Sequence, residues 1–582
     1  METFNQIMSN IGDVMWHESV LVVLLLTGIA YTIWSGFCQY RALTHGPVVL
    51  AGRYDDRDEE GAISHFQALS AVLSATVGLG NIAGVALAVS LGGPGAIFWM
   101  WVVGLVGMAI KLTETVLSML YRNMDDPDNP HGGPMWVVSR AIADWKPSWA
   151  GVGKFIGGLF CVTLLISTIT GGNMFQAYNV GEITNANFGI PTWVTGLVLA
   201  TLVGMVIIGG VKRIGRVAAN LVPFMVIVYL LSGIVILAIN YTEIPEMLRM
   251  IVVHAFTPHE AVNAFVGGGV GMAVLIGMQR AFFSSEAGQG SAPIAYAAAR
   301  TREPVREGLV GAVGPFIDTI VVCTFTALVI LTTGMWDREA EAHFDEAPEI
   351  VSADRENRWT VADTPLPERV SEDRMAADGW EGHEDVFLVV EADYDLREDN
   401  TRHRLNGEIF EQDGQLYVNW STLSAEEQPQ HTDGGIYVSY PGATMTAMAF
   451  DRALPGYGMW MVLLAVWLFA LSTMITWSYY GEQGIVFLFG ERAVMAYRLV
   501  FCVLIVVATL GLIRTEQELN NFSVLGTGAM LWVNIPILIF LGWKAMKAYK
   551  NYIRRLKSGE IQRSKNPPSL RDVIIGDRYD KD

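Results

Sequence analysis

The stretch that decides the fold is ATVGLGNIAG, residues Ala75 to Gly84. It lies within a run free of charged residues, from Ala68 to Leu91, which is long enough for one helix to cross a membrane. Three glycines and an asparagine interrupt this run, and each glycine costs a helix about 1 kcal/mol relative to alanine. The sequence therefore predicts a membrane helix that is broken near its midpoint.

Similar apolar runs recur along the chain. Of the 582 residues, 52% are hydrophobic and 17% are charged, which is typical of a polytopic membrane protein. Eleven apolar spans are predicted, at residues 19–37, 66–92, 95–120, 155–180, 192–210, 217–240, 262–297, 308–335, 456–489, 494–513 and 523–543. The expected fold class is an all-α membrane bundle of about eleven transmembrane helices, with its termini on opposite sides of the membrane.

The charges separate an acidic insert from the rest of the chain. Residues 336–442 contain 27 Asp and Glu against 8 Arg and no Lys, and their net charge of −19 equals that of the whole chain. Short alternating apolar runs around the turn pair Asp413-Gly414 predict a small β-rich domain. Its acidity favours a solvated spacer, with a binding module as the alternative.

The distribution of Lys and Arg predicts the orientation, because cytoplasmic loops hold the excess of these residues. No Lys or Arg precedes the first span, whereas 11 follow from Lys544 onward. We therefore expect a multi-pass protein of the plasma (inner) membrane, with its N-terminus and acidic insert outside and its C-terminal tail in the cytoplasm.

Several classes of function are disfavoured. The four cysteines lie in or beside apolar segments, which favours packing over a disulfide framework or a zinc site. The sequence has no HExxH motif, no phosphate-binding loop and no basic stripe. We expect no enzymatic activity, no organic cofactor, no nucleic-acid partner and no obligate protein partner; the expected surroundings are membrane lipid.

A second interrupted span lies in RAFFSSEAGQGSAPIAYAAAR, residues Arg280 to Arg300. Four predicted spans separate the two breaks and four follow the second, so the chain contains one extra helix and two five-helix halves. Because each half crosses the membrane an odd number of times, the two halves start on opposite sides and have inverted topology. Paired broken helices at matching positions of such halves indicate the midplane site of a transporter. The predicted division is 1–64 for the extra helix and first cytoplasmic loop, 65–240 for the first repeat, 241–335 for the start of the second, 336–442 for the insert, 443–545 for the last three helices and 546–582 for the tail.

The breaks indicate what is bound. An interrupted helix frees backbone N–H and C=O groups that lipid cannot satisfy, so these groups face protein or a wet cavity. A half-helix N-terminus suits a carboxylate, and unwound carbonyls suit a small cation. Thr76, Val77, Gly78 and Gly80 would present this backbone. The alternative is that the glycines only let helices pack closely.

Four polar side chains accompany the breaks. Asn81 either gives a side-chain oxygen to the cation or caps the restarting half-helix. Asp318, a lone acid in an apolar span, is typical of an ion path, with a distant salt bridge or a protonated acid as the alternative. Gln176 either contacts the substrate or makes an interhelical hydrogen bond. Glu286 is expected to support the second break, through freed N–H groups or Arg280, rather than to touch the substrate.

The chain resembles the alanine or glycine:cation symporter family in six motifs, which appear in family order: TVGLGNIAGVA (76–86), GGPGAIFWMW (92–101), GNMFQAYN (172–179), FSSEAGQGSAP (283–293), PFIDTIVVCT (315–324) and STMITWSYYGEQ (472–483). The resemblance implies a sodium-coupled carrier of alanine, glycine or a similar small neutral amino acid, with Na⁺ as the coupling ion and the fold of leucine-transporter-type symporters. The insert is longer than expected of the family. A proton-coupled carrier is the alternative function, followed by a channel or sensor with an acidic outer domain.

The resemblance also implies roles for single residues. Phe283 would cover the substrate and Ser284 would donate an oxygen. Ser472 and Thr473 would bind sodium against the first break. Trp477 lies four residues after Thr473, so it shares a helix face with it and would leave room for small side chains only. The alternatives are hydroxyl groups bonded back to helix carbonyls and an interfacial tryptophan.

Overall fold

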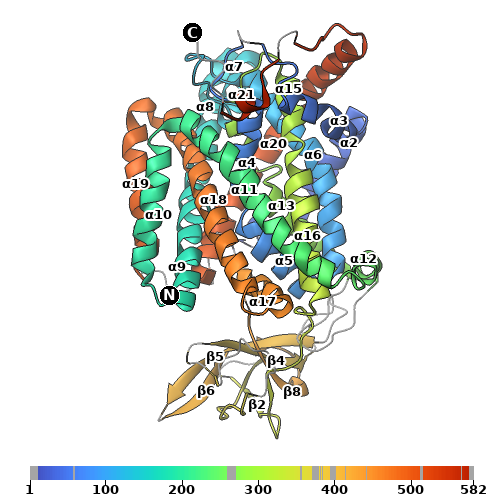
Figure 1. The fold of residues 1–582 in the computed structure, drawn as a ribbon, viewed down its shortest axis with the longest axis vertical. Helices are drawn as coiled ribbons and strands as arrows, with labels where there is room; N and C mark the ends of the chain where they lie inside the picture. Colours follow the sequence, from blue (N-terminus) through green and yellow to red (C-terminus); the bar gives the residue numbers. More distant parts are fainter. Residues whose placement is uncertain are drawn as a thin grey trace.

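The computed structural model of the protein describes residues 11–12, 14–56, 59–257, 270–353, 357–369, 379–380, 382, 384–392, 402–412, 414–440, 442–511, 516–564 and 567–575. A helical bundle carries a β-structured region at one end, and helix α21 lies at the opposite end (Figure 1). The helical elements are α2 (Glu18–Ser35), α3 (Cys38–Leu50), α4 (His65–Thr76), α5 (Leu79–Gly92), α6 (Gly95–Tyr121), α7 (Pro134–Trp145), η1 (Pro147–Trp149), α8 (Ala150–Ile169), η2 (Thr170–Met174), α9 (Phe175–Phe188), α10 (Thr192–Ile207), α11 (Gly210–Ile239), α12 (Ile244–Val253), α13 (Val270–Ser285), α14 (Ala292–Tyr296), α15 (Pro304–Gly311), η3 (Phe316–Val322), α16 (Cys323–Thr332), α17 (Ala443–Ala453), α18 (Gly458–Phe489), η4 (Glu491–Ala493), α19 (Val494–Ala508), α20 (Glu516–Lys557) and α21 (Leu570–Ile575).

Every predicted span overlaps one or more of these helices. Within the described residues, seven helical segments are long and apolar enough to cross a membrane, or eight if the bent pair α4 and α5 counts as one span. The helices α10 and α13 are apolar but shorter. The protein is therefore a multi-pass membrane protein, while the number eleven and the division into inverted repeats stay predictions.

The first predicted break is confirmed. Helix α4 begins with a capping box, in which Ser64 Oγ accepts from the Gln67 N–H over 3.1 Å and Gln67 Oε1 accepts from the Ser64 N–H over 3.0 Å. The helix ends at Thr76, and α5 begins at Leu79 in a direction that differs by 44°. The bend lies at the glycine-rich stretch, where helix propensity is lowest.

The second predicted break is confirmed as well. Helix α13 ends at Ser285 and α14 begins at Ala292. Between them, Glu286, Gly288 and Gly290 have φ angles of 52°, 85° and 82°. Glycine adopts positive φ at little cost, whereas a side chain such as that of Glu286 is strained there. The two glycines therefore explain how the chain leaves the helical conformation at this point.

Two π-helical turns, η2 and η3, were not predicted. Each lies inside a predicted span, next to an α-helix that continues the same segment. A π turn is uncommon; it inserts one residue into the helical repeat and is frequently found at functional positions. Here the two turns contain Asn173 and Asp318, respectively.

Four helices in the connections were also not predicted. They are α3, α7, α12 and α17, which have 13, 12, 10 and 11 residues. Such short helices have no long apolar run, so their sequences resemble loops. Helix α17 follows the insert and packs on α5: Thr446 Oγ1 donates to the Ile82 carbonyl over 3.2 Å.

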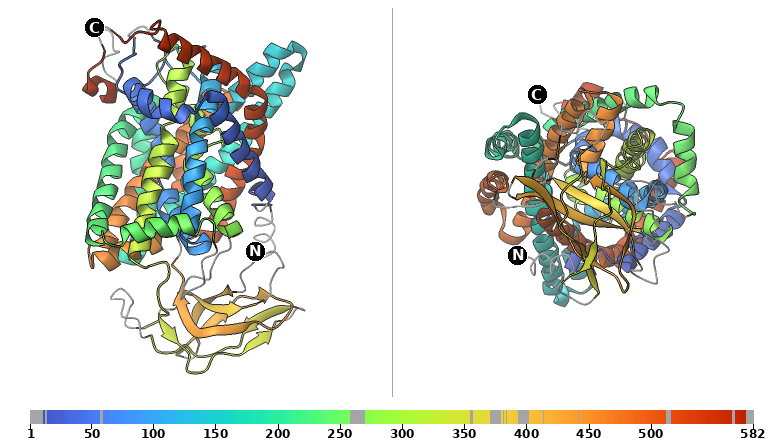
Figure 2. Two further views of the ribbon diagram at one scale, coloured as in Figure 1. Left: turned by 90° about the vertical axis from the view of Figure 1, so that its right-hand side faces the viewer. Right: turned by 90° about the horizontal axis from the view of Figure 1, so that it is seen from below.

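The described part of the insert is β-rich, as predicted. Its strands are β1 (Ala342–His343), β2 (Ile350–Ser352), β3 (Arg358–Val361), β4 (Asp385–Glu391), β5 (Arg402–Gln412), β6 (Gln415–Trp420), β7 (Leu423–Ser424) and β8 (Gln430–Val438). They form a five-stranded antiparallel sheet in the order β1-β8-β4-β5-β6 and a three-stranded sheet in the order β2-β3-β7. The predicted hairpin is β5–β6, in which Gln412 pairs with Gln415. Figure 2 shows the sheets below the end of the bundle.

A polar cluster joins the two ends of the insert. Arg338 Nε donates to Glu341 Oε1 over 3.1 Å, and the Arg338 guanidinium lies 4.6 Å from the ring centre of Tyr440. The backbone of Val438 bonds to both charged side chains, with its N–H donating to Glu341 and its carbonyl accepting from Arg338. The insert thus leaves and re-enters the membrane region at one place.

Candidate substrate and cation site

The two breaks meet around one cavity of about 60 Å³. It is lined by all seven residues predicted to bind substrate, namely Thr76, Gly78, Gly80, Gln176, Phe283, Ser284 and Trp477. A single water needs about 10–15 Å³ on this measure, so the cavity holds only a few water-sized groups. The arrangement therefore suits a small polar solute, while the binding role of each residue stays a prediction.

Asn81 fastens the first break. Its Oδ1 accepts from the Gly78 N–H over 2.9 Å, so the capping interpretation of this side chain is seen in the structure. Its Nδ2 donates to Ser284 Oγ over 2.9 Å and to the Asp318 carbonyl over 3.0 Å. One side chain thus ties together α5, α13 and the turn η3. An amide oxygen has two lone pairs, so Oδ1 also has capacity for a cation.

Asp318 is fully buried beside this junction. Its Oδ1 accepts from the Thr319 hydroxyl, whereas its Oδ2 has no hydrogen-bond partner among the described residues. Thr76 Oγ1, at the end of α4, also makes no hydrogen bond of normal geometry there, but it lies close enough to the Asp318 carboxyl group to interact with it. No ion pair to Asp318 occurs within the described part of the chain. A buried carboxylate oxygen without a partner is costly, and a bound cation or a proton would remove that cost.

Helix α18 contacts the other side of the first break. Ser472 Oγ and Thr473 Oγ1 each lie 3.2 Å from the Ser74 carbonyl, and Ser74 Oγ donates to the Ser472 carbonyl over 2.6 Å. Thr473 Oγ1 is 3.0 Å from the place where a Cβ on Gly78 would be. Ser472 also bonds back to the Phe469 carbonyl over 2.9 Å. The hydroxyl pair therefore lies against the break, as the resemblance implied.

The predicted cation residues thus fall into two groups. Ser472 and Thr473 lie with Ser74 on the side of α18, whereas Asn81 and Asp318 lie together on the side of η3. Val77 is buried at the break itself but does not line the cavity.

Trp477 and Gln176 also line the cavity, from α18 and α9. A Cβ on Gly172, in the turn η2, would lie 2.5 Å from Trp477 Cβ, so this glycine allows the close approach of the two helices. Gln176 Nε2 donates to the Gly171 carbonyl over 3.1 Å, while its Oε1 is buried without a partner among the described residues. An unpartnered amide oxygen is suited to an ammonium group of a substrate.

Glu286 contacts the second break, although not through Arg280, and, contrary to expectation, it also lines the cavity. Its Oε2 accepts from Ser291 Oγ over 2.5 Å, which closes the loop between α13 and α14. No ion pair between Glu286 and Arg280 occurs among the described residues. Lys111 and Glu114 form a buried ion pair nearby, with 3.9 Å between Nζ and Oε1.

The cavity has further lining residues that were not predicted to bind substrate, among them Ser167, Phe175, Gln289 and Thr527. Gln289 lies in the second break, so the break itself could have drawn attention to it. The other three lie on helices whose cavity-facing side depends on tertiary packing. Nothing in the local sequence distinguishes them from packing residues.

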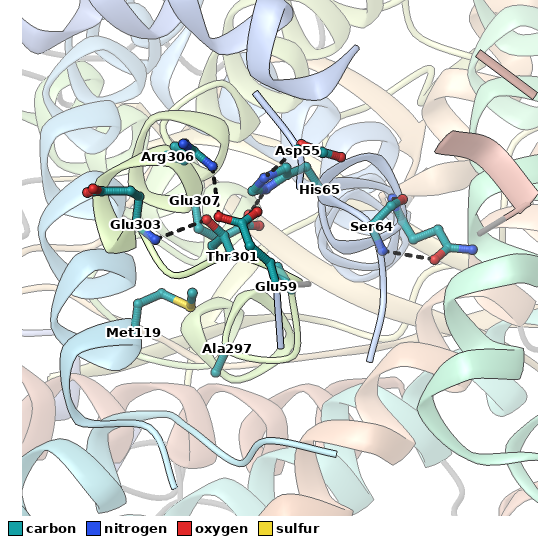
Figure 3. Close-up of polar contacts among 12 residues, drawn as sticks. Asp55, Glu59, Ser64, His65, Met119, Ala297, Thr301, Glu303, Arg306 and Glu307 are labelled. Carbon is teal, nitrogen blue, oxygen red and sulfur yellow. Dashed lines mark hydrogen bonds and ion pairs between the residues drawn. The ribbon is translucent and has the colours of Figure 1, made fainter. Parts of the chain in front are cut away.

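An ion-pair network lies at the N-terminal end of α4, away from the cavity. His65 is buried between two carboxylates, with Nε2 at 3.5 Å from Asp55 Oδ1 and Nδ1 bonded to Glu307 on α15. Beside it, Arg306 Nη1 donates to Glu59 over 3.0 Å (Figure 3). This network joins the first broken helix to α15 and to the segment after α3.

Comparison with known proteins points to the family that the motifs resemble. A sequence model described as the sodium:alanine symporter family matches residues 1–353 and 432–566. The sodium/alanine symporter AgcS of Methanococcus maripaludis is 33% identical over 554 residues, which cover 95% of this chain and 98% of that protein. A Bacillus subtilis protein, provisionally named a sodium/proton-dependent alanine carrier (YrbD), is 31% identical over 552 residues, covering 95% of this chain and 93% of its own. The amino-acid carrier protein AlsT of the same species is 26% identical over 580 residues, covering 98% of each chain.

The family match omits residues 354–431, which lie inside the acidic insert. This agrees with the expectation that the insert is longer than the family requires. The match covers both breaks, both π turns and all the predicted site residues. The chain belongs to the sodium:alanine symporter family, and it is therefore a membrane transporter and not an enzyme.

Proposed function

We propose that the protein imports alanine, glycine or a similarly small neutral amino acid together with Na⁺ across the inner membrane, by alternating access. The observation that carries this proposal is the convergence of both helix breaks on one cavity of about 60 Å³. The relatives named as alanine carriers support the choice of substrate. The N-terminus and the insert would lie outside, in accord with the distribution of Lys and Arg.

The substrate would be held mainly by main-chain groups. Helix α5 begins at Leu79, so its first N–H groups and the positive end of its dipole are directed to the break. These groups suit the substrate carboxylate, and Gln176 Oε1 together with carbonyls of the second break suits the ammonium group. Phe283 and Trp477 would limit the side chain to a hydrogen or a methyl group, because both rings line the small cavity.

Sodium would bind on the α18 side of the break, to the Val77 carbonyl and the hydroxyl oxygens of Ser472 and Thr473. Neutral oxygens at the end of a half-helix are suited to an alkali ion. Asn81 and Asp318 form the second oxygen-rich place, which is separated from the first by the α4 chain end. A second sodium ion there would give the Asp318 carboxylate a partner.

Proton coupling is the second candidate, and Asp318 is the observation that favours it. A buried carboxyl group with one unpartnered oxygen can take up a proton instead of a cation. The name of YrbD mentions both sodium and protons, which keeps both ions in consideration for this chain.

The test is uptake of radiolabelled alanine by proteoliposomes that contain the purified full-length protein. We expect uptake to require an inward sodium gradient and to be inhibited by glycine but not by leucine or glutamine. Equal uptake in potassium, driven by a pH gradient, would replace sodium by protons. No uptake of any small amino acid under either gradient, by protein that keeps its thermal transition, would refute the proposed function.

A further inference from the structure

A second cavity lies between the ends of α6 and α20, away from the substrate cavity. It is a groove of about 530 Å³ lined by Leu120 and Tyr121 of α6 and by Trp543, Lys544, Lys547 and Asn551 of α20. These ends of α6 and α20 lie at the end of the bundle opposite the β-sheets (Figure 2). Nothing in the transport mechanism uses this groove.

The charge of the groove has one sign. Two lysines line it and no Asp or Glu does. Lys544, Lys547 and Asn551 are spaced by three and four residues, so they lie along one face of α20. A concave surface with cationic walls concentrates anions, because the low-dielectric protein focuses the field.

Lys544 is held in place at the wall of the groove. Its Nζ donates a hydrogen bond to the Tyr121 hydroxyl and lies 5.1 Å from the centre of that ring. The same Nζ lies 5.8 Å from the ring of Trp543. An ammonium group has three donors, so Lys544 keeps donors for a further acceptor. Lys547 is exposed at the mouth of the groove.

The groove lies where an apolar helix surface ends. On α20, Ile539 and Phe540 just before the groove are 49% and 75% exposed, and Trp543 in its wall is 47% exposed. On α6, Leu120 is 42% exposed. Exposed apolar side chains on a membrane helix face lipid tails, and tryptophan is enriched where tails meet headgroups. A ligand in the groove would therefore place an anionic group on the lysines and an apolar part along α20.

We propose that this groove binds the headgroup of an anionic phospholipid, whose phosphate contacts Lys544 and Lys547 and whose acyl chains lie on Phe540 and Trp543. The proposal rests on the orientation proposed above, which puts the groove on the cytoplasmic side, where basic pockets between membrane helices recognise such headgroups and the leaflet carries the anionic lipids. Free phosphate shares the charge but not the apolar part. The exposed apolar surface next to the lysines therefore favours the lipid.

The test is native mass spectrometry of the full-length protein, titrated in detergent with phosphatidylglycerol, with phosphatidylcholine or with inorganic phosphate. We expect selective retention of phosphatidylglycerol by the wild type. Each lysine near a membrane surface contributes an attraction that corresponds to about fivefold in affinity. The variant K544Q/K547Q should therefore lose most of the bound phosphatidylglycerol. The matched control is K550Q/K557Q, which removes two exposed lysines of the same helix that do not line the groove.

Two results would overturn the proposal. One is equal retention of phosphatidylglycerol by the wild type and by K544Q/K547Q; the other is displacement of the lipid by inorganic phosphate at equal concentration, which would make the groove a site for a free anion. Because Lys544 also bonds to Tyr121, its loss could disturb the local fold. The single variant K547Q changes only an exposed side chain, and it should still lower the affinity for phosphatidylglycerol about fivefold.

Discussion

The side-chain amide of Asn81 donates a hydrogen bond to the backbone carbonyl of Asp318 over 3.0 Å. The bond joins the first broken helix to a π turn in a segment more than 200 residues later, and it places a buried carboxylate beside the break. The same amide bonds to Ser284 of the other broken helix. One asparagine thus determines how the parts of the site lie relative to each other.

Asn81→Ala should therefore weaken both the fold and the site. Loss of a helix cap costs about 1 kcal/mol, and the Gly78 N–H loses its acceptor. We expect a lower thermal midpoint and a higher sodium concentration for half-maximal alanine uptake. The control is Asn173→Ala, which removes another buried interhelical bond, to the Phe501 carbonyl. If both variants changed the sodium dependence equally, Asn81 would have only a structural role.

Asp318→Asn tests the unpartnered carboxylate oxygen. The substitution keeps the shape of the side chain but removes its charge. If Asp318 faces sodium, the sodium affinity should fall about tenfold or more, because a cation loses its only charged ligand. If Asp318 carries the coupling proton, the uptake that a pH gradient drives should be lost, because an amide cannot take up that proton. Transport with unchanged ion dependence in both respects would exclude Asp318 from coupling.

Trp477 and Gly172 offer a test of substrate size. Trp477→Ala enlarges the cavity and should admit larger neutral amino acids, measured as competition with labelled alanine. Gly172→Ala should reduce uptake of all substrates, because its Cβ would collide with Trp477. Combining the two substitutions should restore little of the uptake, because alanine keeps the Cβ of residue 477, which would still lie 2.5 Å from the new Cβ. Gly151→Ala is the neutral control, because no atom lies within 4 Å of its Cβ position. An unchanged competition profile for Trp477→Ala would remove this residue from the pocket.

The ion-pair network around His65 should contribute to stability. Glu307→Gln leaves His65 and Asp55 buried without the second carboxylate, and breaking a buried ion pair costs about 3–5 kcal/mol. We expect a clear decrease in the thermal midpoint of the purified protein. The matched control is Glu246→Gln, which breaks the ion pair between Glu246 and Arg249. The side chains of these two residues are 52% and 70% exposed, respectively. Exposed pairs contribute about 0–1 kcal/mol, so this variant should melt almost like the wild type. Equal midpoints for both variants would contradict a stabilising role of the network.

The sequence predicted features that depend on local composition. Both helix breaks follow from glycine-rich stretches inside apolar runs, and the β5–β6 hairpin follows from Asp413-Gly414 between alternating segments. Each of the seven residues predicted to bind substrate belongs to a helix break or to a family motif, and all seven line the cavity. The π turn at Asp318 was missed, because an extra residue in a helix leaves the hydrophobic pattern almost unchanged. The partners of Asn81 were missed for another reason: Ser284 and Asp318 are distant in sequence, so only tertiary packing brings them near.

The register of β1 and β8 allows a precise test of the insert. His343 pairs with Gly435, so residues 344–434 can be replaced by Asn-Gly, a pair that closes a two-residue hairpin. This deletion keeps Arg338, Glu341 and Tyr440, which join the two ends of the insert. If the acidic domain is a solvated spacer, sodium-dependent alanine uptake should be retained in proteoliposomes. A deletion variant that keeps its thermal transition but loses uptake would show instead that the insert takes part in transport.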